Sequence, residues 1–145
     1  MKEELTDFSL RRNDMLTLIV IPTDKKDKNV ELLESFAGVA NDVVFLKEGN
    51  LDYNIKVNTI WKIFMYEGEV LDKDLQKALP EYLQLGLDFD VFSIYKLSNT
   101  GYSICPRLFK NEVRMKSNSI EADEQGLVFN TILDGFISRW IIPAV

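Results

Sequence analysis

The chain has 145 residues, 46% of them hydrophobic, and this composition suits one compact domain spanning residues 1–145. The formal net charge of −6 at pH 7 argues against a nucleic-acid partner, because a phosphate backbone is held by clustered Lys and Arg. The sequence has no His, which removes the usual near-neutral base and the imidazole metal ligand, and its single Cys105 excludes an internal disulfide.

The sequence also predicts where the protein works. Residues 1–14 carry acids where a signal peptide needs a cationic and then an apolar run. No apolar stretch approaches the ~20 residues of a membrane span. A lone cysteine fits a reducing compartment. We therefore expect a cytoplasmic protein without a transmembrane segment.

The first part of the chain has the pattern of a β-α-β unit. Residues 15–21 form a continuous apolar run with β-branched members, which is typical of a strand buried on both faces. Residues 30–40 place apolar side chains at helical spacing, with Gly38 as a stop signal, and residues 42–46 are a second apolar run. The handedness rule for such units makes the two strands neighbours in a parallel sheet.

A strand and a helix are expected in the middle of the chain. Residues 61–65 are apolar enough for a buried strand, and Asp72 opens a helical pattern that continues to about Leu85. Pro80 lies within that pattern, so we expect it to break the helix and to begin a new first turn.

The last part of the chain is expected to begin with a hairpin. Residues 90–97 and 102–109 alternate apolar and polar side chains on either side of Ser-Asn-Thr-Gly. Residues 112–116 are expected to add a short strand. Residues 124–140 fit either a final helix or a strand followed by an irregular tail.

Three segments occur in an order that resembles a known enzyme family. They are residues 16–50 (LTLIVIPTDKKDKNVELLESFAGVANDVVFLKEGN), residues 61–75 (WKIFMYEGEVLDKDL) and residues 88–111 (DFDVFSIYKLSNTGYSICPRLFKN). Together they resemble the family 2 glycosyltransferases, in particular the bacterial branch that decorates lipopolysaccharide and related glycans. Each motif alone is weak, but their order and internal spacing make the resemblance specific.

The resemblance implies an α/β, truncated type A glycosyltransferase-like fold: a mostly parallel sheet flanked by helices, with a C-terminal hairpin. It also implies a divalent metal on an Asp-x-Asp motif, which neutralises the leaving diphosphate. Tyr66 and Gly68 stand where those two Asp residues are expected, and Glu69 keeps the acid that follows them. A helix, a strand and a second helix of the family pattern are missing between residues 50 and 61.

Several residues are candidates for what remains of this chemistry. Arg107 and Lys47 are the candidates for contact with a nucleotide sugar, although Lys47 reverses the charge of the Asp expected from the family. Glu67 and Glu69 could together hold Mn or Mg as a displaced Glu-x-Glu pair. Glu121 or Asp123 would then serve as the catalytic base.

The lost Asp-x-Asp motif favours one functional hypothesis and leaves two alternatives open. We expect a glycosyltransferase-like domain that lacks metal-dependent catalysis, needs no cofactor and acts as a binding or interaction module for a glycan, a nucleotide sugar or a protein partner. The first alternative is an active nucleotide-sugar glycosyltransferase that uses Glu67 and Glu69. The second is a structural subunit of a homodimer or hetero-oligomer.

Overall fold

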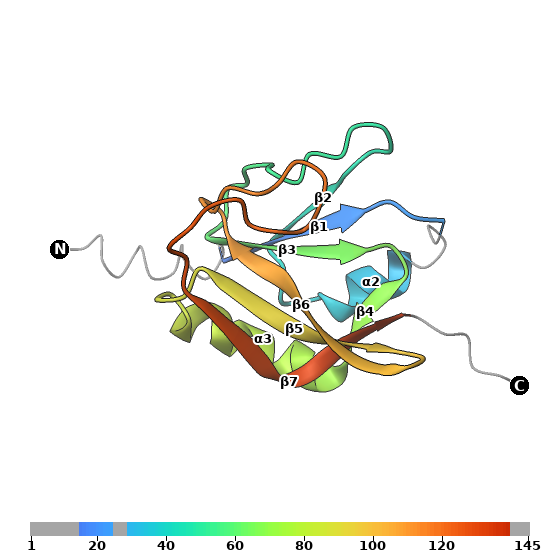
Figure 1. Cartoon of the computed structure of the whole chain (residues 1–145). Coiled ribbons are helices and arrows are strands. Elements are labelled where there is room, and N and C mark those ends of the chain that lie inside the picture. The colour runs from blue at the N-terminus through green and yellow to red at the C-terminus, as the bar shows by residue number, and fades with distance from the viewer. Residues whose placement is uncertain (1–14, 25–28, 140–145) are drawn as a thin grey trace, which may run out of the picture.

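The computed structural model describes residues 15–24 and 29–139, so the expectations for residues 1–14 and for Trp140 lie outside the described residues. One seven-stranded sheet in the order β2-β1-β3-β6-β5-β7-β4 dominates this part of the chain (Figure 1). Its strands are β1 (Leu16–Ile21), β2 (Asp42–Phe45), β3 (Trp61–Tyr66), β4 (Glu69–Leu71), β5 (Val91–Ser98), β6 (Gly101–Lys110) and β7 (Phe129–Arg139). Two helices accompany it, α2 (Asn29–Ser35) and α3 (Lys73–Leu85).

The sheet is mixed and curls back toward its own beginning. β1 pairs in parallel with β2 and with β3, which confirms the predicted β-α-β neighbours. From β3 onward the pairing is antiparallel, through β6 to β5, until β5 pairs in parallel with β7. β4 follows β3 after a single turn, yet it lies at the other end of the strand order, against β7.

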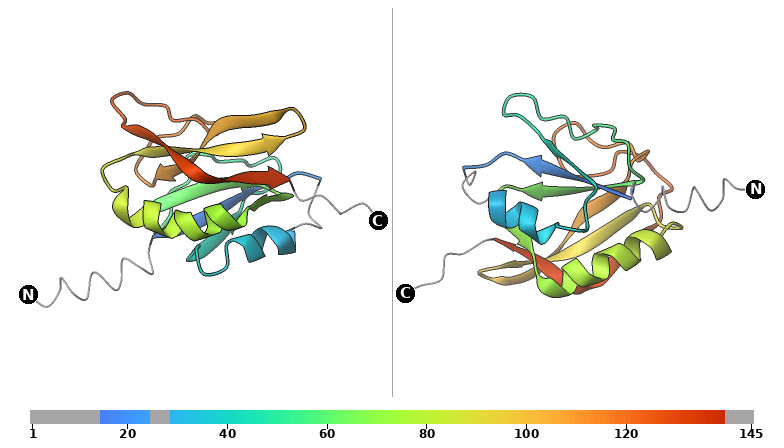
Figure 2. Two further views of the ribbon diagram at one scale, coloured as in Figure 1. Left: turned by 90° about the horizontal axis from the view of Figure 1, so that it is seen from below. Right: turned by 180° about the vertical axis from the view of Figure 1, so that it is seen from behind.

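The predicted fold class, a mostly parallel sheet flanked by helices in the type A glycosyltransferase manner, is wrong. The described chain is mostly strand, and its two helices have only 7 and 13 residues. Both helices lie on the same face of the sheet (Figure 2). The prediction failed because a true β-α-β unit was extended to the whole sheet, whereas β5 and β6 form an antiparallel hairpin and β6 also pairs antiparallel with β3.

The two faces of the sheet are covered by different material. On the helical face, apolar side chains of β1, β3 and β5 pack against α2 and α3, with Leu75, Leu79 and Leu83 of α3 buried at intervals of four residues. On the other face, loop residues Leu46, Tyr53, Val113 and Met115 cover Phe64 and Phe109. β1 is therefore buried along its whole length, as its apolar run predicted.

Four local expectations are also settled. α3 runs without interruption through Pro80, so the predicted break is wrong. Residues 112–116 form no strand and contribute only an isolated bridge between Met115 and Ala122. Of the two expectations for residues 124–140, the strand is confirmed, because the described chain ends with β7. The predicted hairpin of β5 and β6 is also confirmed.

A wide irregularity in β7 lies against the start of α3. Ile94 of β5 pairs with Ile132 of β7, and Lys96 pairs with Ile137. Residues 133–136 of β7 therefore lie opposite a single residue of β5. At its centre Gly135 has φ +86°, a left-handed conformation that favours glycine. The Asp72 carboxylate, which caps α3, accepts hydrogen bonds from the amides of Leu75 and Phe136, each at 2.9 Å. One side chain thus joins the cap of the helix to the irregular part of the strand.

Lys62 is a fully buried lysine in β3, an interior strand of the sheet. Its Nζ donates a hydrogen bond to the Ile55 carbonyl at 2.7 Å. Burial, together with the nearby positive charge of Lys56, lowers the pKa of Lys62 to about 8. The folded protein therefore sheds this proton at a lower pH than the unfolded chain, whose lysines have a pKa of about 10.4.

We predict that Lys62→Met removes a pH dependence of stability. Between about pH 8 and 10.4 the unfolded chain binds a proton at Lys62 that the folded chain has released, so wild-type stability rises with pH in that window. Urea unfolding at pH 7 and pH 10 should show this rise to be smaller by roughly 2–3 kcal/mol in Lys62→Met. Lys77→Met, at an exposed position of α3, is the control and should keep the wild-type rise. Equal slopes for wild type and Lys62→Met would contradict the prediction.

Candidate functional site

β3 and β6 separate after three residue pairs, and the candidate site begins at that separation. They are paired from Trp61 to Ile63 only. Immediately beyond, β6 contains a bulge, because Leu108 lies opposite Phe92 while Pro106 lies opposite the next residue, Ser93. The residue between them, Arg107, has no partner on β5. A bulge of this kind redirects a side chain and ends regular pairing.

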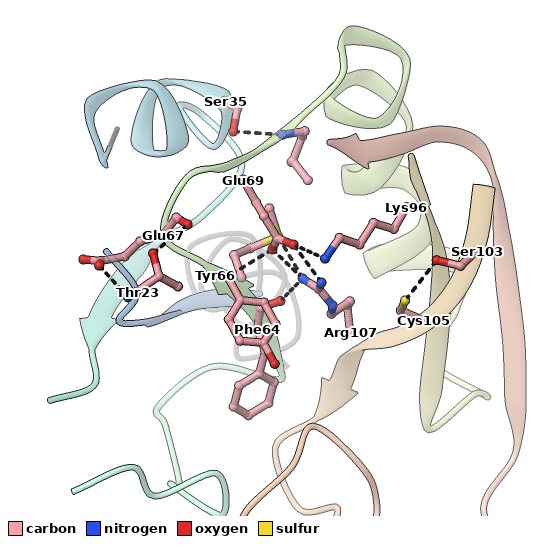
Figure 3. A network of polar contacts seen from close by, with 12 residues as sticks. Thr23, Ser35, Phe64, Tyr66, Glu67, Glu69, Lys96, Ser103, Cys105 and Arg107 are labelled. Carbon is pink, nitrogen blue, oxygen red and sulfur yellow. Dashed lines mark hydrogen bonds and ion pairs between the residues drawn. The ribbon is translucent and has the colours of Figure 1, made fainter. Parts of the chain in front are cut away.

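The Arg107 side chain occupies the gap between the two strands. Its Nη1 donates to the Phe64 carbonyl of β3 at 3.1 Å, in place of a backbone hydrogen bond from β6. The same guanidinium forms a two-pronged ion pair with the Glu69 carboxylate, at 2.7 Å from Nη1 and 2.9 Å from Nη2 (Figure 3). Such a planar match of guanidinium and carboxylate gives both energy and fixed geometry.

Glu69 receives two further donors. Lys96 Nζ of β5 lies 2.9 Å from Oε2, and the Tyr66 amide donates to Oε1 at 2.8 Å. Both cations lie over the Tyr66 ring and make cation–π contacts with it: the ring centroid is 5.2 Å from the Arg107 guanidinium carbon and 5.7 Å from Lys96 Nζ. Glu69 is only 2% exposed, so its charge is balanced by protein groups and not by water.

The pKa values of this ion pair follow from competing effects. Burial alone would raise the pKa of Glu69, but the hydrogen bonds and charge of Arg107, with the Tyr66 amide and Lys96, outweigh it and hold the pKa below its ordinary value. Burial would likewise lower the pKa of Arg107, and Glu69 reverses that effect and raises it. Both groups are charged in the folded protein at neutral pH.

Glu67 points away from this ion pair. Its Oε1 accepts from the Thr23 amide at 2.8 Å, and its Oε2 accepts from the Asn29 side-chain amide at 3.0 Å. The Thr23 hydroxyl also donates to the Glu67 carbonyl at 3.2 Å. Glu67 is 7% exposed and joins the end of β1 and the start of α2 to the β3–β4 turn.

A cavity of about 350 Å³ opens beside these residues. It lies beyond the carboxyl ends of the parallel strands β1 and β3, which is the usual position of ligand sites in sheets with parallel strands. Arg139, opposite Glu69 in the β4–β7 pairing, brings a further positive charge. The lining residues are Thr23, Asp24, Tyr66, Glu67, Gly68, Glu69, Lys96 and Arg139.

The structure brings together three of the six residues proposed from the sequence. Glu67 and Glu69 line the cavity, and Arg107 binds Glu69 behind its wall. Lys47 lies exposed after β2, while Glu121 and Asp123 lie exposed in the loop before β7, with Glu121 paired to Lys116 at 3.2 Å. These last three residues are not among those that line the cavity.

The two glutamates do not converge as metal ligands. Every carboxylate oxygen of Glu67 and Glu69 already accepts a hydrogen bond from a protein donor. A divalent cation would have to displace Arg107 and Lys96 from Glu69, and it would meet their positive charges at close range. Within residues 15–24 and 29–139, no group of three or more acidic, His or Cys side chains is placed to hold a metal ion. The residues as arranged do not fit a metal site.

Sequence reasoning missed Lys96 and Arg139. Lys96 belongs to a hairpin strand whose local pattern predicts a solvent-facing lysine, and Arg139 reaches the cavity only because β7 pairs with β4. The contact of Lys96 with Glu69 and the pairing of β7 with β4 both join distant parts of the chain, so the local spacing of residues does not predict them. Tyr66 had been noted only as a replacement for a metal ligand, and the structure gives it a contact with both cations.

Comparison with family models and with curated protein sequences finds no match for the chain. In the described part of the chain, neither helix has the length and apolar character needed to cross a membrane.

Proposed function

We propose that this chain is a binding module that holds an anionic small molecule, such as the diphosphate of a nucleotide sugar, in the cavity beside the β3–β4 turn. Protein cations take the role that a metal has in the family it resembles. Lys96 and Arg139 contact the anion, and Arg107 acts through Glu69 and Tyr66 by fixing their positions.

The observation that carries this proposal is that two cations, Lys96 and Arg139, line a cavity in which the carboxylates of Glu67 and Glu69 already accept hydrogen bonds from protein donors. Arg107 alone balances the Glu69 carboxylate, so Lys96 contributes a second positive charge at 2.9 Å. The Lys96 side chain is 25% exposed and lies in the cavity wall, and an ammonium group has three donors, of which Glu69 uses one. Its other donors and those of Arg139 are available to phosphate oxygens.

The engaged glutamates favour binding over metal-dependent transfer. A hard cation needs free carboxylate oxygens, whereas Glu67 and Glu69 already bond to protein groups. Catalysis through a Glu67–Glu69 metal pair therefore requires a rearrangement of the turn. Direct binding of an anion by Lys96 requires none.

We expect nucleotide diphosphates to stabilise the protein without added metal. Thermal unfolding should be followed with uridine, guanosine and thymidine diphosphate sugars and with pyrophosphate, each in the presence of EDTA. A ligand at a hundred times its dissociation constant adds about 2.7 kcal/mol of stability, which should raise the midpoint by several degrees. Lys96→Gln should abolish the shift, while Lys77→Gln, at an exposed position on α3, should retain it.

Two results would overturn the proposal. If no diphosphate shifts the midpoint in any condition, the cavity is not an anion site. If the shift requires Mn or Mg and is lost in Glu67→Gln, the metal-dependent transferase is the better assignment.

A further inference from the structure

A second cavity of about 480 Å³ lies at the junction of α3, the β5–β6 hairpin and the irregular part of β7. Its walls contain three aromatic rings and two carboxylates, and no Lys or Arg is among its lining residues. These residues are Asp72, Asp74, Tyr95, Tyr102, Leu133, Gly135 and Phe136. The cavity beside the β3–β4 turn has a mixed set of charges, so the two sites suit different ligands.

The aromatic rings meet at steep angles. The rings of Tyr95 and Tyr102 have centroids 6.3 Å apart and an interplanar angle of 83°, and those of Tyr102 and Phe136 are 5.6 Å apart at 68°. Tyr102 is 60% exposed, so its ring is accessible from solvent. Rings arranged in this way offer more than one negative π face to a single group placed in the corner between them.

The carboxylates add negative charge at the same place. Asp72 Oδ1 is fixed by the amides of Leu75 and Phe136, so this carboxylate has a defined position at the cavity wall. Asp74 is exposed in the first turn of α3 and forms no ion pair with any described residue. The aromatic faces and the two carboxylates therefore make this cavity negative, and no Lys or Arg is among its lining residues.

We propose that this cavity binds a quaternary or methylated ammonium group. Such a group carries a positive charge on a weakly hydrated, apolar surface, and it is attracted to π faces and to nearby carboxylates at once. A neutral ligand of the same shape would gain only the apolar contact. The group could belong to a free choline-like molecule or to a trimethyllysine side chain, since both present the same trimethylammonium chemistry.

A titration followed by amide and methyl NMR spectra tests this site directly. Choline should shift the amides of Gly135 and Phe136 in a saturable manner, and its methyl protons should show contacts to the Tyr102 ring. The neutral isostere 3,3-dimethyl-1-butanol should bind at least several-fold more weakly. A short trimethyllysine peptide and its unmodified counterpart, titrated in parallel, distinguish a protein partner from a free small molecule.

Matched variants separate the aromatic and electrostatic contributions. Tyr102→Leu keeps the apolar volume but removes the π face, and it should weaken choline binding roughly three- to thirtyfold, as the loss of one cation–π contact implies. Tyr102→Phe should stay within about threefold of wild type. Asp74→Asn should weaken binding and reduce its dependence on salt. Lys96→Gln, in the other cavity, should leave choline binding unchanged.

The proposal is overturned by either of two outcomes. Equal binding of choline and its neutral isostere would make the cavity a general apolar site. Absence of saturable shifts with choline and with the trimethyllysine peptide would remove the assignment altogether. Neither result bears on the diphosphate titration, because that site shares no lining residue with this one.

Discussion

Replacing Arg107 with Met is expected to lower the free energy of unfolding by about 3–5 kcal/mol, because it leaves a buried carboxylate without its main partner. Glu69 is 2% exposed and would keep only Lys96 and the Tyr66 amide. The Phe64 carbonyl would also lose its donor at the point where β3 and β6 separate. Urea unfolding at pH 7 measures the change.

The double variant Arg107→Met with Glu69→Gln provides the control. Removing both charges should restore part of the lost stability, so the two changes should be strongly non-additive.

The pH dependence of stability provides a second check. The lowered pKa of Glu69 contributes stability that is present above its unfolded value near 4.3 and is lost as pH falls through the folded value. The deficit of Arg107→Met should therefore shrink below pH 4. A loss under about 1 kcal/mol at pH 7 would instead indicate an ordinary surface pair.

Gly135→Ala is expected to be about as destabilising, by roughly 3–5 kcal/mol. A Cβ at this position would lie 2.3 Å from the Leu75 amide nitrogen and 2.4 Å from Asp72 Oδ1, and φ is +86°. The added methyl group therefore collides with the helix cap while the backbone is also strained. Thermal unfolding should show a midpoint lower by roughly 10–20 °C.

Gly126→Ala is the matched control for this variant. Gly126 has φ +80°, but a Cβ there would meet nothing within 4 Å. Its cost should be limited to backbone strain, about 1–2 kcal/mol. If both variants lose the same stability, then the close approach of β7 to α3 contributes nothing, and the account of the Asp72 junction is wrong.

The strands with strong local patterns were predictable, and the way they assemble was not. The apolar run of β1 and the turn residues between β5 and β6 act locally, so sequence spacing identifies them. β4 has only three residues, Glu69–Leu71, and exists because β7 pairs with it from the other end of the chain. The curl of the sheet follows from that pairing, and the hydrophobic periodicity of the sequence does not predict it.

The candidate site shows the same division. Glu67, Glu69 and Arg107 could be singled out because charged residues beside apolar runs are unusual. Their use could not be predicted, because it depends on a bulge in β6 that leaves Arg107 without a partner on β5. Under one alternative, the sequence predicted that Glu67 and Glu69 share one metal ion. The structure directs them to different donors, Thr23 and Asn29 for the first and Arg107 and Lys96 for the second.

The pairing of β4 with β7 has a consequence for how the protein is made. Val70 lies opposite Ser138, so nearly seventy residues must be synthesised between one side of this contact and the other. Closing so long a loop is slow compared with forming a hairpin, because its entropy is lost before any contact compensates. On the ribosome, Arg139 can reach Glu69 only after β7 has emerged. The cavity beside the β3–β4 turn is therefore completed only when β7 pairs with β4.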